Sequence, residues 1–129
     1  MADKGRSINI DGVQHGAPIP MGARVGNMIF SSGIIGADPS TGKVPEDLDS
    51  QCVLAFANMK TMLENGGATT KNVGTIKVYM KDRSQRDAVN RPWLEMFPDE
   101  NDRPARHAIE YDAFPPGVLV QLEIVAVVD

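Results

Sequence analysis

The sequence lacks three features that would each point to a particular class of protein. Its single cysteine, Cys52, excludes a disulfide framework or a thiolate metal site within one chain, which fits a reducing compartment. No stretch approaches the roughly twenty apolar residues that span a bilayer, and residues 1–6 lack the apolar run of a secretory signal. No lysine and arginine run is long enough for a nucleic-acid patch, and the formal net charge of -4 disfavours a phosphate-backbone partner. We therefore expect a soluble, cytoplasmic protein that binds neither membrane nor nucleic acid.

The length of 129 residues favours one compact domain over residues 1–129, and its N-terminal part predicts strands around a loop. Residues 7–11 alternate weakly, as a short edge strand does, and the next eleven residues are rich in glycine and proline. Residues 23–25 and 28–35 flank a Gly-Asn pair, which predicts a hairpin. Alternation along the second of these strands puts four side chains on one face: Met28, Phe30, Ser32 and Ile34.

Two positions in this part are candidates for chemistry. Ser32 is the one hydroxyl on that strand face, and Gly33 after it leaves the backbone open to close approach by a ligand. A cross-strand hydrogen bond from Ser32 explains the pattern equally well. In the preceding loop His15 can carry a proton, although a lone loop histidine is more often solvated.

The middle of the chain predicts two helices and a strand. Residues 46–65 repeat apolar side chains at helical spacing, with acidic residues in the first turn and two glycines after the last. Residues 73–80 alternate as a half-buried strand. Residues 84–97 form a second helix, capped by Ser84, which Pro92 must kink or restart. The apolar stripe of the first helix predicts a core that includes the lone cysteine as a small buried hydrophobe.

The C-terminal part predicts two strands joined by a Pro-Gly turn at residues 114–117, and we expect them to pair antiparallel. Alternate side chains from Val118 to Val128 are apolar and predict the face that the helices cover. The whole order of elements gives an α+β fold, with a sheet that carries two helices on one side. The other face is too apolar for a stable monomer, so we expect closed oligomerisation through it. We place four polar side chains on that face: Ser32, Arg106, Gln121 and Glu123.

Arg106 follows Arg103-Pro104-Ala105 at the mouth of a strand and is our first candidate for the chemistry. Its planar fork can hold a carboxylate bidentately and stays charged near neutral pH, so it suits capture of a small acidic substrate. For an arginine considered alone, an interface or surface ion pair is the simpler explanation.

Several motifs occur in order from about Ala23 onward. They are Gly26-Asn27-Met28-Ile29-Phe30-Ser31-Ser32-Gly33, Asp38-Pro39-Ser40-Thr41-Gly42, Gln51 with Asn58-Met59-Lys60, Asn90 with Trp93, Pro104-Ala105-Arg106, and Val120-Gln121-Leu122-Glu123-Ile124-Val125-Ala126-Val127. Together they resemble the Rid (YjgF-type) family of enamine and imine deaminases.

This resemblance implies a chorismate-mutase-like mixed sheet, with three subunits forming a homotrimer around a central β-barrel and pockets at the subunit clefts. It also implies a hydrolase that needs no cofactor and no metal and converts 2-aminoacrylate and related 2-imino acids to 2-keto acids and ammonia. In that comparison Arg106 matches the arginine that holds the substrate carboxylate, and Ser32 with Gly33 matches a ligand-lining pair. Asn90 joins the candidate substrate-binding residues through its shared motif.

Three positions depart from the family pattern. Ala108 stands where better-studied deaminases have a cysteine, and Gln121 stands where they have a water-activating glutamate in the last strand. Ile19 is the nearest counterpart of their pocket tyrosine. An amide cannot accept a proton as a carboxylate does, so Gln121 cannot be the general base and another residue must take that role. Glu123 on the same strand face, or His15 from its loop, is the substitute that we consider.

Two hypotheses follow from these residues, and a third is disfavoured. The first is a 2-imino and enamine acid hydrolase anchored by Arg106. The second is a non-catalytic carboxylate-binding or regulatory trimer that lost the hydrolytic residues, as Gln121 and Ala108 would indicate. A ribonuclease activity, sometimes attached to this family, is disfavoured by the acidic charge and the lack of a basic stripe.

Overall fold

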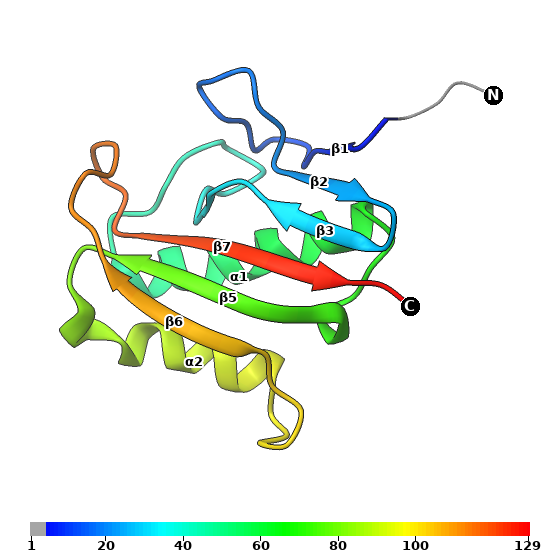
Figure 1. Cartoon of the computed structure of the whole chain (residues 1–129). Helices are drawn as coiled ribbons and strands as arrows, with labels where there is room; N and C mark the ends of the chain where they lie inside the picture. The colour runs from blue at the N-terminus through cyan, green and yellow to red at the C-terminus, as the bar shows by residue number, and fades with distance from the viewer. Residues whose placement is uncertain (1–4) are drawn as a thin grey trace.

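Two α-helices pack against one face of a seven-stranded mixed sheet (Figure 1). The computed structural model describes residues 5–129; most of residues 1–6, in which we expected no secretory signal, lies outside this range. The sheet order is β1-β2-β3-β7-β5-β6, and β4 also pairs with β7. This confirms the predicted α+β class with both helices on one side. The elements are β1 (Ser7–Ile8), β2 (Gly22–Val25), β3 (Met28–Ser31), β4 (Ile34–Ile35), α1 (Leu48–Asn65), η1 (Thr70–Asn72), β5 (Val73–Met80), η2 (Arg83–Gln85), α2 (Asp87–Met96), β6 (Ala105–Glu110) and β7 (Val120–Val127).

The predicted N-terminal hairpin is confirmed, but its second strand is shorter than expected. Gly26 turns the chain with a φ of 60°, a value that glycine adopts without steric cost. Pairing with β2 stops at Ser31, and the chain resumes as β4 two residues later. These two unpaired residues shift the alternation, so Ile34 is fully buried on the helix side instead of sharing the face of Phe30. The expected common face for residues 28–34 is therefore wrong at its end.

The predicted helix at residues 84–97 begins later than expected. Asp82 accepts hydrogen bonds from the Ser84 backbone N–H at 2.9 Å and from its hydroxyl at 2.6 Å. This arrangement forms a separate 3-10 turn, so Ser84 does not cap the α-helix, which starts at Asp87. The α-helix continues through Pro92 and does not restart there. The predicted helical segment is instead interrupted before Asp87, between the 3-10 turn and the α-helix.

The two C-terminal strands do not pair with each other, which corrects our prediction. The turn between them has the expected form, because Val118 N–H donates to Pro115 O at 3.1 Å and Gly117 has a φ of 85°. However, β6 pairs parallel with β5, and β7 pairs antiparallel with β3, β4 and β5. The segment β5-α2-β6 is thus a parallel crossover, which needs a long connection and leaves β6 at the sheet edge.

Gln51 on α1 is fully buried. Its side chain is hydrogen-bonded to the loop before α1 and to the loop before β7. Its Nε2 donates to Pro45 O and to Gly117 O, both at 2.8 Å, and its Oε1 accepts from Leu119 N–H at 2.9 Å. An apolar residue of similar size would leave three backbone groups without these partners.

We expect Gln51→Leu to lower the free energy of unfolding by about 3 kcal/mol, because several buried polar groups lose their hydrogen bonds together. Urea denaturation of the variant and the parent protein measures the difference. Glu64→Gln, on the exposed side of the same helix, serves as the control and should change stability little. Equal stability of Gln51→Leu and the parent would contradict this role.

The core confirms the predicted helix-facing sides of α1, β5 and β7. Cys52 is fully buried within it, and burial, with a smaller contribution from Asp49, raises the pKa of the thiol to about 12. A thiol in this state is not a nucleophile at neutral pH, so Cys52 acts as a small core side chain. Within residues 5–129, no helix combines the length and apolar character needed to cross a membrane.

Candidate active site

Arg106 lies on the helix-covered side of the edge strand β6. It is in register with Ile76 of β5, which is fully buried on that side. Our placement of Arg106 on the open face with Gln121 and Glu123 is therefore wrong. The reason is the parallel pairing of β6 with β5, which orients Arg106 and Ala108 toward α2.

The guanidinium of Arg106 is held by two residues of α2. Its Nη2 donates to Asn90 Oδ1 at 2.7 Å, and its Cζ lies 4.9 Å from the centre of the Trp93 ring. Its Nη1 is buried and has no hydrogen-bond partner among the described residues. Burial, followed by the nearby charge of Arg86, lowers the pKa of Arg106. A buried donor without a partner favours a bound acceptor, and an anion would also offset this unfavourable charge.

A second group of candidate residues forms around β4 and β7. A Cβ atom on Gly33 would lie 2.5 Å from the Gln121 side-chain amide, so glycine allows these two residues to meet. Gln121 stands on the open face of the sheet, in register with Ile35 and Tyr79. The structure thus brings Gly33 together with Gln121, two residues that the sequence places far apart.

Ser32 belongs to this group but does not make the cross-strand bond that we considered. The half-buried Ser32 donates its backbone N–H to Met21 O at 2.8 Å. The bond to the neighbouring strand is made by Ser31, whose Oγ accepts from Ile124 N–H at 2.8 Å. Ser31 therefore has the structural role of tying β3 to β7.

Glu123 lies on the same open face as Gln121, as expected from their spacing. Tyr79 OH donates to Glu123 Oε1 at 2.8 Å, and this hydrogen bond raises the pKa of Tyr79. Lys77 is the residue of β5 directly opposite Glu123. The phenol therefore stays protonated and orients the carboxylate.

His15 and Ile19 line a separate cavity of about 450 Å³ in the N-terminal loop. The cavity is lined only by residues between Ser7 and Met21. His15 Nε2 is buried and without a partner among the described residues, whereas Ile19 is 49% exposed. The structure places these two candidates together and does not bring them to Arg106.

The two main groups of candidate residues do not meet within one chain. Strands β5 and β7 separate β6 from β4, which puts Arg106 and Gly33 three strand spacings, or roughly 14 Å, apart across the sheet. Arg106 also lies on the side opposite Gln121. The candidate residues of one chain thus form two separate groups: one of Arg106, Asn90, Trp93 and Ala108, and a second of Ser32, Gly33, Gln121 and Glu123.

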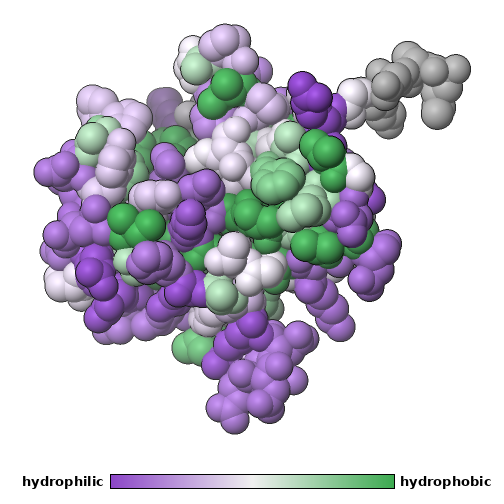
Figure 2. Space-filling view, viewed as in Figure 1, coloured by the Kyte–Doolittle hydropathy of each residue, from purple (hydrophilic) through white to green (hydrophobic). Residues whose placement is uncertain are grey.

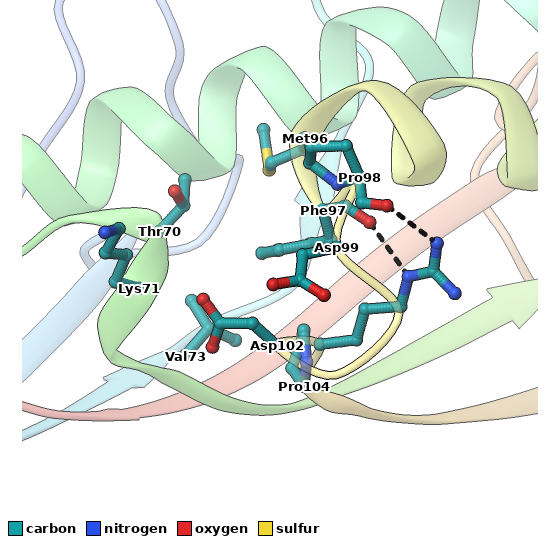
Figure 3. A pocket seen from close by; sticks show the side chains of 10 residues that line it. Thr70, Lys71, Val73, Met96, Phe97, Pro98, Asp99, Asp102 and Pro104 are labelled. Atoms are coloured by element: carbon teal, nitrogen blue, oxygen red, sulfur yellow. Dashed lines mark hydrogen bonds between the residues drawn. The ribbon is translucent and has the colours of Figure 1, made fainter.

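Another hollow, of about 260 Å³, lies beside the end of α2 (Figure 3). Asp99, Asp102 and Lys71 contribute to its lining, and Arg106 does not. Arg103 ties this region down by donating from Nε to Phe97 O at 2.8 Å and from Nη2 to Pro98 O at 3.3 Å. Its role is structural, since it fixes the loop from which β6 starts. In the described part of the chain, no group of three or more His, Cys, Asp or Glu side chains is placed to hold a metal ion.

Sequence reasoning missed two members of the Arg106 surroundings. Trp93 was noted only as part of a motif shared with the family and was given no role in the site, and Arg86 was not singled out. The available signal was spacing, because Arg86 and Asn90 are four residues apart and share one side of a helix.

Comparison with known proteins gives a consistent result. A family model described as endoribonuclease L-PSP matches residues 18–128. A RutC family protein of Pyrococcus abyssi is 35% identical over 116 residues, covering 85% of this chain and 90% of the relative. The 2-iminobutanoate/2-iminopropanoate deaminase of Escherichia coli is 32% identical over 111 residues, covering 85% and 87%. The crystal structure of the E. coli YjgF gene product superposes with a TM-score of 0.85 at 30% identity, covering 95% of this chain and 98% of that one. The chain therefore belongs to the Rid (YjgF-type) family.

Proposed function

We propose that the protein hydrolyses 2-imino acids and their enamine tautomers to 2-keto acids and ammonia, with Arg106 binding the substrate carboxylate. The observation that carries this proposal is the buried Nη1 of Arg106, which has no hydrogen-bond partner in the described part of the chain although Asn90 and Trp93 already position the side chain. A carboxylate bound there completes the hydrogen bonding of the guanidinium. Relatives named 2-iminobutanoate/2-iminopropanoate deaminase support the reaction class.

The reaction needs orientation more than strong activation. Water adds to the imine carbon and forms a C–O bond, protons move from oxygen to nitrogen, and the C–N bond breaks to release ammonia. No atom changes oxidation state across the overall reaction, so no redox partner is required. A fixed guanidinium that holds the carboxylate also holds the adjacent imine carbon in one place for the attacking water.

We further propose a homotrimer around a central barrel, in which each active site combines the two groups of candidate residues, one half-site from each of two neighbouring subunits. The separation of Arg106 from Gln121 within one chain supports this arrangement. Figure 2 views the open face and shows hydrophobic side chains gathered over β2, β3 and β7, where Val25, Phe30 and Val127 are 57%, 42% and 45% exposed. Covering this face in an oligomer removes that apolar surface from water.

Glu123 is our choice for the group that accepts the proton of the attacking water. Gln121 cannot do so, whereas Glu123 offers a carboxylate on the same face of the same strand. The hydroxyl of Tyr79 holds that carboxylate in place at 2.8 Å. His15 remains the second candidate, because its buried Nε2 has no partner among the described residues.

The test is direct. Freshly generated 2-iminopropanoate is offered to the purified protein, and keto-acid release is followed against trapping of the imine by semicarbazide. Faster release than in protein-free buffer supports the proposal, and sedimentation equilibrium of the same sample tests the trimer. No acceleration at any protein concentration would overturn the hydrolase proposal.

Two other functions make different predictions for the same sample. Gln121 favours a carboxylate-binding trimer without turnover, for which calorimetry would detect binding of 2-keto acids but the assay would show no hydrolysis. The description of the family model raises endoribonuclease activity. RNA cleavage that survives Arg106→Ala and repeated purification would favour that activity over ours.

A further inference from the structure

A second arginine stands beside the Arg106 anchor. The backbone carbonyl of Arg86 accepts from Asn90 N–H at 3.0 Å, so the two residues lie one helical turn apart. Side chains at this spacing share one side of a helix, with Cβ atoms about 5–6 Å apart. Asn90 in turn holds Arg106 at 2.7 Å. The Arg86 side chain therefore starts next to the half-site that contains Arg106.

The charges in this neighbourhood are not balanced. Arg86 is exposed and forms no ion pair within residues 5–129. After burial, its positive charge is the second cause of the lowered pKa of Arg106. Asp87 Oδ1 accepts from the side-chain amide of Asn90 at 3.5 Å, and Glu110 accepts the backbone N–H of Arg83 at 3.3 Å. Within residues 5–129, the guanidinium groups of Arg86 and Arg106 thus form no ion pair with a carboxylate. An anionic ligand would supply the missing charge.

From this arrangement we infer that Arg86 binds a second carboxylate, so that the preferred substrates are dicarboxylic 2-imino acids such as 2-iminosuccinate and 2-iminoglutarate. The inference rests on the proposed imine hydrolysis and names its substrate class. Arg106 binds the carboxylate next to the imine carbon, and Arg86 binds the one at the end of the substrate side chain. An aliphatic 2-imino acid engages Arg106 alone and leaves the charge of Arg86 unused.

The experiment compares two substrates in three proteins. Each amino-acid oxidase product, 2-iminosuccinate from aspartate and 2-iminopropanoate from alanine, is offered to the parent protein, Arg86→Gln and Arg91→Gln. We expect the parent to have the higher kcat/KM for 2-iminosuccinate, and Arg86→Gln to reduce the ratio of the two kcat/KM values about tenfold. Arg91→Gln removes the same charge from the same helix, at a side chain paired with Asp49 at 2.9 Å, and should leave the ratio unchanged.

Failure of this inference and failure of the proposed function give different results. Hydrolysis of both substrates with no preference for 2-iminosuccinate, or with a ratio that Arg86→Gln does not alter, overturns the inference and leaves the hydrolase standing. If neither substrate is hydrolysed, the proposed function fails. Calorimetry with 2-oxoglutarate and pyruvate then decides the second anion site: tighter binding of 2-oxoglutarate that Arg86→Gln abolishes supports it, and equal binding overturns it.

Discussion

Arg106→Ala should lower kcat/KM for 2-iminopropanoate hydrolysis by about 100-fold, because a charge-assisted hydrogen-bonded contact to the substrate carboxylate is lost. The loss removes both the charge that attracts the acid and the geometry that orients the imine carbon. Steady-state kinetics with imine generated in the assay measures the effect.

Two matched variants separate substrate binding from folding. Arg106→Lys keeps the positive charge but not the planar fork, so we expect an intermediate loss. Arg91→Ala, also an arginine substitution on the helix side, removes an exposed ion pair with Asp49 and should leave the rate unchanged. Because Arg106 also packs on Trp93, circular dichroism must first show that Arg106→Ala is folded. A folded Arg106→Ala protein with the parent rate would refute the anchor role.

Glu123→Gln should lower kcat by about 100-fold, the smaller end of what a general base contributes. The amide keeps the shape of the side chain and an oxygen that can accept from Tyr79 OH, so the fold should remain intact. Tyr79→Phe provides the comparison, because it removes the orienting hydroxyl and retains the carboxylate; we expect a loss of less than about tenfold. Full turnover by Glu123→Gln would move the proton-accepting role away from this residue, and His15→Asn would then be the variant to measure.

Mixing the two inactive variants tests whether each site is shared between subunits. If Arg106 and Glu123 come from different chains, co-refolded Arg106→Ala and Glu123→Gln subunits should recover about a quarter of the parent activity, because each half-site has an even chance of being intact. If both groups act within one chain, every site in the mixture carries one defect and no activity returns. The separately refolded variants are the controls.

The sequence predicted the local structure well where one stretch of chain contains all the information. Strand β5 at Val73–Met80 matches the predicted range, because its alternation reflects one buried face and one partly exposed face. Helix α1 starts two residues inside the prediction, where Asp47 caps it by accepting from Ser50 N–H at 2.9 Å. The Pro-Gly turn also formed as expected, since both residues restrict the backbone independently of their surroundings.

Strand pairing could not be predicted in the same way. The observed pairing puts Arg106 on the opposite side of the sheet from the one that we predicted. Adjacent strands joined by a turn usually pair, yet β7 enters the middle of the sheet and β6 pairs with β5. The choice depends on which strands become neighbours in the assembled sheet, a property that no single segment determines. Once β6 paired parallel with β5, Arg106 pointed to Asn90 and Trp93 instead of Gln121.

By itself, therefore, the sequence determined which residues could do the chemistry: a fork-shaped cation at Arg106, a backbone opening at Gly33 and an amide at Gln121 that cannot act as a base. These are properties of side chains and local backbone. Only the tertiary structure decided where they lie: Arg106 and Gln121 are on opposite sides of the sheet, in two separate groups of residues, and Arg86 is one helical turn from Asn90. That arrangement depends on strand order and on helix packing across the sheet, contacts between residues distant in the chain, for which local pattern carries no signal.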